Sequence, residues 1–184
     1  NRNGKTISTQ AAMDKAVKGI CDILRRDKAK GARLYVPELT WMFFLRFFDM
    51  QEQQEEARAK AGRRGFVESI PAPFRWRDWA APKDESATVQ VGADAKAQGW
   101  KRQDLTETKT EINSFLSFVN GELFPFLIGL KEKPGATQKQ KVIGEIFANK
   151  ERTIIASQTN LLDVVDRVHW LTSGSIDEQH MFPI

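Results

Sequence analysis

The sequence has 184 residues, of which 41% are hydrophobic and 28% are charged, a composition typical of a globular protein. Its net charge of +4 is mild, and one cysteine with two histidines excludes an intrachain disulfide and a typical zinc site. The sequence shows no signal peptide and no apolar stretch of membrane-spanning length, so we expect a cytoplasmic protein that does not enter a membrane.

An amphipathic segment over residues 8–26 predicts the first helix. Its apolar residues recur at helical spacing and form one stripe, made of Met13, Val17, Ile20, Cys21 and Leu24. Ser8 or Thr9 can cap this helix, and Gly31 is expected just past its end. Because a buried free cysteine behaves as a small hydrophobe, we interpret Cys21 as a core residue.

The most apolar segment, Leu39 to Met50, predicts a central helix around which the others pack. Residues 41–45 are apolar without a break, and they cover the whole circumference of a helix. We therefore expect this front half to be buried and the polar residues 51–60 to be exposed. Pro37 is expected in the first turn, where its missing N–H would have no partner in any case.

Two sets of charged residues on the central helix need an explanation. Arg46 and Asp49 lie three positions apart and can pair, either as a structural ion pair at the edge of the core or as a contact with a partner subunit. Glu52, Glu55 and Glu56 are crowded carboxylates. A solvated helix face explains these three better than metal binding does.

Helical periodicity fades between residues 62 and 103, which we interpret as one long irregular insertion. Prolines forbid a regular helix over residues 70–79, and we expect Phe74, Trp76 and Trp79 to pin this segment. Residues 82–99 are small and polar, and residues 88–91 are a weak candidate for a strand.

The basic excess of the chain falls in the same region. Between Arg58 and Arg102 the net charge is +5, which leaves −1 for the remainder. The candidate DNA-contacting residues are Arg63, Arg64, Arg75, Arg77, Lys101 and Arg102. Such cations can neutralise phosphates and bind DNA without reading its sequence. The alternative is an ordinary solvated surface with the tryptophans packed inward.

The remaining sequence completes an all-α pattern. Apolar stripes recur in residues 104–119, 123–130, 139–148 and 159–171. Asn120-Gly121 predicts a kink or a break, Lys133-Pro-Gly135 a turn, and Thr159 or Asn160 the cap of the last helix. We predict a compact bundle of about five or six helices around the buried central helix, forming a single domain over residues 1–184.

Motifs that carry chemistry are scarce. The sequence has no Walker loop, no G-x-G-x-x-G and no G-x-S-x-G. His169, next to Trp170, is better explained as a structural residue than as a catalytic one. Asp84 and Glu107-Thr-Lys109 echo a nuclease pattern only faintly, because that pattern needs neighbouring strands. We predict no catalytic, cofactor-binding or metal-binding residue in this chain.

The order of these landmarks resembles the N-terminal helical domain of the modification subunit of type I restriction-modification systems. The central run is similar to the family's F-L-[KR]-x-x-[SD]-D, with Phe48 where the family often has a small polar residue. The resemblance extends from about Ala11 to Asp177. The matching pieces are Cys21-Asp-Ile-Leu-Arg25, Phe44-Leu-Arg-Phe-Phe-Asp49, the loop 70–76, Ile143-Gly-Glu-Ile-Phe147 and Leu161-Leu-Asp-Val-Val165.

The resemblance implies a parent that methylates adenine N6 in double-stranded DNA with S-adenosylmethionine. The family's cofactor motif and its N-P-P-[FY] motif are missing here, so we expect a catalytic Rossmann-like domain after residue 184. The apolar end, Met181-Phe-Pro-Ile184, agrees with a parent chain that continues. The resemblance also implies that two modification subunits and one specificity subunit close around the duplex, with a restriction subunit as a further partner.

Two other hypotheses account for the sequence less completely. One is a free-standing helical module that binds protein or nucleic acid, and the other is a small enzyme with an unrecognised site. The hypothesis that the resemblance supports, a DNA-clamping and subunit-contacting domain, is the one that explains both the missing catalytic motifs and the apolar end.

Overall fold

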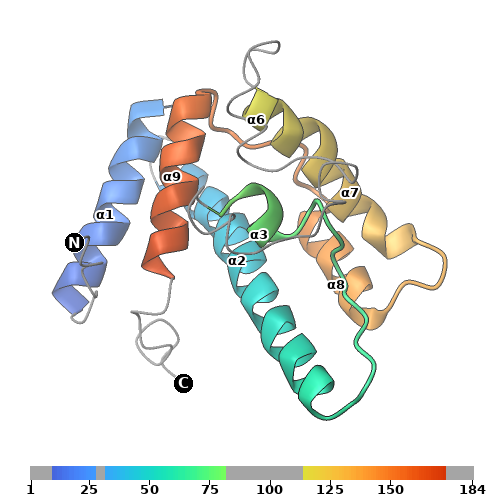
Figure 1. Ribbon diagram of the computed structural model, residues 1–184. Helices are drawn as coiled ribbons and strands as arrows, with labels where there is room; N and C mark the ends of the chain where they lie inside the picture. The colour runs from blue at the N-terminus through green and yellow to red at the C-terminus, as the bar shows by residue number, and fades with distance from the viewer. Residues whose placement is uncertain (1–9, 28–31, 82–113, 173–184) are drawn as a thin grey trace. The chain divides into compact units, whose positions relative to one another are not determined.

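The computed structural model describes residues 10–27, 32–81 and 114–172, and every regular element within these ranges is a helix (Figure 1). The predicted all-α fold is therefore confirmed for this part of the chain. The chain divides into two compact units, one of Asn1–Met42 with Ile154–Ile184 and one of Phe43–Thr153. Among the described residues, no helix is both long enough and apolar enough to cross a membrane.

The first unit is built on two helices that lie side by side, α1 (Gln10–Asp27) and α9 (Gln158–Leu171) (Figure 1). Asp27, the last residue of α1, holds the start of α9. Its carboxylate accepts hydrogen bonds from the backbone N–H of Ala156 at 2.9 Å and of Ser157 at 3.1 Å, and from Asn160 Nδ2 at 2.9 Å. The buried position of Cys21 confirms its interpretation as a core residue.

The cap of α9 lies earlier than the sequence suggested. The side chain of Ser157 accepts a hydrogen bond from the backbone N–H of Asn160, and the helix begins at Gln158. The prediction of Thr159 or Asn160 as the cap was therefore wrong by two or three residues. Ser157 has the extended backbone that a cap requires, whereas Asn160 already lies in the first turn and binds Asp27.

The long helix α2 spans Ala32–Ala61, so it begins five residues before Pro37. The prediction that Pro37 lies in the first turn was wrong. The helix continues through Pro37, whose φ is compatible with a helix, although the proline lacks an N–H donor and its ring crowds the carbonyl four residues earlier. Its end at Ala61 agrees with the loss of helical periodicity that the sequence shows from residue 62.

Burial along α2 is less complete than its apolar pattern suggested. Trp41, Met42 and Leu45 are almost fully buried. The four phenylalanines are only half-buried, and they stack in two pairs one turn apart, Phe43 on Phe47 and Phe44 on Phe48. The apolar run is therefore a core stripe flanked by stacked aromatic rings.

In the second unit one helical rod follows the insertion. It consists of α6 (Ser114–Phe118), the π-helical turn η2 (Val119–Leu123), α7 (Phe124–Gly129) and the 3₁₀ turn η3 (Leu130–Glu132). The predicted kink at Asn120-Gly121 takes the form of the π turn. The wider turn suits the arrival of Pro125, which has no N–H to donate back into it.

A tight turn connects this rod to α8 (Gln138–Phe147), which lies beside α7 (Figure 1). The backbone N–H of Ala136 donates to the carbonyl of Lys133 at 3.0 Å, and Gly135 has a φ of 74°, so the predicted turn is confirmed as type II. Thr137 and Gln140 then form a reciprocal capping box at the start of α8.

Aromatic side chains form the centre of the second unit. Trp76 and Trp79 of α3 (Trp76–Trp79) are fully buried, and Trp79 packs against Phe115 and Phe118. Phe74 stacks on Phe126 with ring centroids 4.0 Å apart. The prediction that these aromatics pin residues 70–79 is confirmed. The expected absence of a helix there was wrong for Trp76–Trp79, which follow the last proline of the segment and form α3.

Several predictions concern residues outside the described ranges. They are the cap at Ser8 or Thr9, the helix end at Gly31, the strand at residues 88–91, and the candidates Lys101 and Arg102.

Candidate nucleic-acid interface

The basic residues of the insertion fall into two groups with different surroundings. The first group lies at the end of α2 and is called here the α2 basic end. It consists of the exposed residues Arg58, Lys60, Arg63 and Arg64. Cations in the last turn of a helix are favoured because the carbonyl end of the helix carries a partial negative charge.

The backbone explains why the α2 basic end projects from the helix. The N–H of Gly62 donates to the carbonyl of Arg58 at 2.9 Å, and the N–H of Arg64 donates to that of Ala59 at 2.7 Å. Arg63 between them has a φ of 53°, the left-handed conformation typical of a residue that closes a helix. Arg63 and Arg64 therefore follow the helix end directly, and both side chains are exposed.

Within the described part of the chain, no ion pair holds the side chains of the α2 basic end. Arg63 and Arg64 were predicted as DNA-contact candidates, and the structure leaves both guanidinium groups accessible. Arg58 and Lys60 were not among the candidates, although the positive charge of this region already included them. All four cations fall within seven consecutive residues at the end of α2.

The second group, Arg75 and Arg77, is used inside the protein. The Arg75 guanidinium donates to both carboxylate oxygens of Asp78, at 2.9 and 3.0 Å, and lies 3.4 Å from Glu68. Burial favours a lower pKa for Arg75, but the hydrogen bonds to Asp78 and the charges of Asp78, Glu68 and Asp49 outweigh it and raise the pKa overall.

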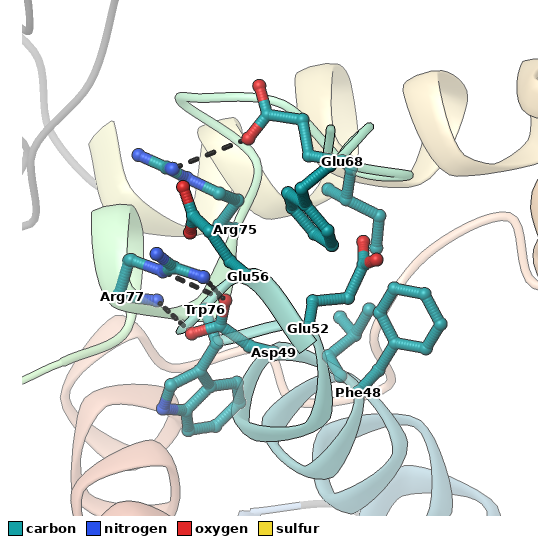
Figure 2. A pocket seen from close by; sticks show the side chains of 11 residues that line it. Phe48, Asp49, Glu52, Glu56, Glu68, Arg75, Trp76 and Arg77 are labelled. Carbon is teal, nitrogen blue, oxygen red and sulfur yellow. Dashed lines mark hydrogen bonds and ion pairs between the residues drawn. The ribbon is translucent and has the colours of Figure 1, made fainter. Parts of the chain in front are cut away.

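Arg77 joins α3 to α2 through Asp49 (Figure 2). Its Nε and Nη2 atoms donate to Asp49 Oδ1 at 2.9 and 2.7 Å, and its backbone N–H donates to Oδ2 at 3.2 Å. The side chains of Arg77 and Asp49 are only 12% and 5% exposed. This fork therefore acts as a buried link between segments 28 residues apart.

Arg46 and Asp49 were the candidates for a subunit contact. Both are buried, and the carboxylate of Asp49 is held by Arg77. This geometry favours the structural interpretation of Asp49. Contact of Arg46 and Asp49 with a partner subunit stays a prediction.

The acidic residues of α2 are not one solvated face, so that prediction was wrong for Glu52. Glu52 is buried, and its Oε1 accepts a hydrogen bond from the backbone N–H of Ser69 at 2.7 Å. Glu55 pairs with Lys139 of α8 at 2.7 Å, and Glu56 is exposed. The described residues contain no group of carboxylates, histidines or cysteines arranged to hold a metal ion.

His169 is almost fully buried on α9, in edge-to-face contact with Trp170. Its position agrees with the structural interpretation. Lys101 and Arg102 are the remaining DNA-contact candidates, and the structure does not describe them.

Residues 13–168 match the model of a family described as the HsdM N-terminal domain. A curated relative is the type I restriction enzyme EcoEI methylase subunit of Escherichia coli, 24% identical over 172 residues. That alignment covers 93% of this chain and 29% of the relative.

Two solved structures are also similar. One is a modification subunit assigned to a type I restriction enzyme of Vibrio vulnificus YJ016, with a TM-score of 0.66 and 26% identity over 95% of this chain and 33% of that chain. The other belongs to a study of complex assembly and conformational transition of the type I R-M system, with a TM-score of 0.59 and 28% identity. It matches 87% of this chain and 26% of that chain, so this sequence spans a third or less of each similar protein.

Proposed function

This chain belongs to the HsdM N-terminal domain family, and we propose that it helps a type I modification enzyme to close around double-stranded DNA. In this proposal the chain binds no cofactor itself. A Rossmann-like catalytic domain after residue 184 transfers a methyl group from S-adenosylmethionine to adenine N6. A specificity subunit, a second modification subunit and a restriction subunit complete the assembly.

The observation that carries the DNA-binding part is the α2 basic end. Its four side chains are exposed, and no ion pair with a described residue neutralises them. A phosphate backbone offers the missing negative charge, and binding to it releases counterions from the DNA. Phosphate contacts position a protein on a duplex but do not read its sequence, so recognition of the target is assigned to the specificity subunit.

Replacing Arg63 and Arg64 with alanine in the parent enzyme tests this proposal. Affinity should fall for target and non-target duplexes by the same factor, because phosphates are common to both. Fluorescence anisotropy with the two duplexes at several salt concentrations measures this. A loss confined to the target duplex would contradict the proposal, since it would mean that these arginines read bases.

The chain alone should bind DNA weakly, because a clamp gains its affinity by combining several weak surfaces. It should also neither bind S-adenosylmethionine nor methylate DNA, since the glycine-rich cofactor loop of such enzymes is absent from its sequence. Calorimetry with S-adenosylmethionine checks the second expectation. Micromolar binding by this chain would place a cofactor site within it and refute that part of the proposal.

A further inference from the structure

A small pocket lies between α2 and the segment that leads into α3 (Figure 2). It has room for about one water-sized group. Four carboxylates line it against two arginines, and aromatic rings complete the wall. The charged residues are Asp49, Glu52, Glu56, Glu68, Arg75 and Arg77, and the aromatic ones are Phe48, Phe66 and Trp76. Such a lining suits a small cation better than an anion or an apolar ligand.

Glu52 is the residue that makes this pocket unusual. The residue is only 5% exposed, and its Oε1 is satisfied by the backbone N–H of Ser69. Its Oε2 is buried and has no hydrogen-bond partner in the described part of the chain. Lys139 Nζ forms an ion pair with that oxygen at 4.0 Å, which is beyond hydrogen-bond distance, because this ammonium is held 2.7 Å from Glu55.

The two arginines that line the pocket do not donate a hydrogen bond to Oε2 of Glu52. Arg77 is bound to Asp49, and Arg75 is bound to Asp78 and Glu68. Glu56, one turn after Glu52 on α2, is exposed and adds negative charge to the pocket. A buried carboxylate oxygen without a donor is costly, and a charged donor would relieve that cost most strongly.

We propose that the pocket receives the ammonium group of a lysine from a partner protein. An ammonium is close to water in size, whereas a guanidinium fork is larger than the space. The rings of Phe48, Phe66 and Trp76 line the pocket and can favour a cation. Val67, between two lining residues, is 80% exposed, and the aliphatic stem of a lysine can pack on such a surface.

The first test uses N-acetyl-lysine amide as a probe, with its ε-acetylated form as the control that lacks the charge. The backbone N–H of Ser69 donates to Glu52, so its NMR signal reports on the pocket. The lysine probe should shift this signal saturably and the acetylated probe should not. Equal responses to both probes, or no response to either, would overturn the proposal.

Glu52→Gln is the matched variant, because its amide oxygen can still accept from Ser69 while the charge is lost. Glu145→Gln, on the exposed side of α8, makes the same charge change elsewhere. The probe response should disappear only in Glu52→Gln. A response that survives in Glu52→Gln would show that the probe binds at another place.

The source of the lysine is tested in the parent enzyme, and this arm rests on the proposed assembly with partner subunits. Glu52→Gln should weaken that assembly about tenfold relative to Glu145→Gln, as expected when one member of a buried charge pair is lost. Equal assembly of the two variants would contradict a partner lysine. If the unaltered parent does not assemble, the proposed function fails, while the probe titration still decides whether the pocket binds ammonium.

Discussion

The α2 basic end and the pair Arg75 and Arg77 belong to the same basic stretch of sequence, but their positive charges have different surroundings. Arg63 and Arg64 extend into solvent and meet no acid in the described part of the chain. Arg75 and Arg77 are held by aspartates that are themselves buried. A surplus of positive charge along the sequence therefore does not show which cations are available to a phosphate; buried acids elsewhere in the fold decide it.

The largest loss of stability is expected when a buried side chain is removed from α3, the helix that contains Arg77. Trp79→Ala should lower the free energy of unfolding by about 3–5 kcal/mol, because this side chain is fully buried against other aromatic rings. Urea denaturation measures it. Trp170→Ala is the matched control, and it should cost about 1 kcal/mol or less since Trp170 is 50% exposed. Similar losses for both would mean that α3 is not packed as described.

Removing the acid that holds Arg77 should have the next largest effect. Asp49→Ala leaves a nearly buried guanidinium and a backbone N–H without their acceptor, so we expect a loss of about 3 kcal/mol. Asp163→Ala breaks an exposed pair with Arg167 and should cost less than about 0.5 kcal/mol. Thermal melts of the two variants compare their stabilities. If Asp49→Ala lost as little stability as Asp163→Ala, the link to Asp49 would not hold Arg77, and Arg77 would be available to phosphate like Arg63 and Arg64.

A smaller effect is expected where α2 is only partly covered. Phe44 is half-buried between Phe48 and Phe147, so Phe44→Ala should cost about 2 kcal/mol. Continuous burial around the helix, as its apolar pattern suggested, would give about 3–5 kcal/mol instead. Equilibrium denaturation of this variant beside Trp79→Ala separates the two descriptions of α2.

The sequence was informative where one local pattern determines the outcome. Apolar patterns identified the long helices, Lys133-Pro-Gly135 identified its turn, and Trp76 and Trp79 are packed in the core as expected. The ordered landmarks also indicated the family, which the match over residues 13–168 confirms.

The failures concern pairings between distant residues. Asp49 could be matched with Arg46 by spacing along one helix, but its link to Arg77 depends on how the insertion returns to α2. Glu52 was interpreted as part of a solvated face because nothing in the sequence indicates that its carboxylate accepts a hydrogen bond from the backbone N–H of Ser69. The cap at Ser157 is likewise held by a distant residue, since its backbone N–H donates to the carboxylate of Asp27 at the end of α1.

The most direct test of the division between the two groups is the salt dependence of DNA binding by the parent enzyme. The Arg63→Ala/Arg64→Ala and Arg75→Ala/Arg77→Ala variants remove the same charge, and both are measured at a temperature at which they are folded. The first should reduce the log–log salt slope by about 1.8, which corresponds to two lost phosphate contacts, while its free energy of unfolding changes by less than about 0.5 kcal/mol. The second should lose stability and keep its slope. An unchanged slope in the first variant with a reduced slope in the second would contradict this account.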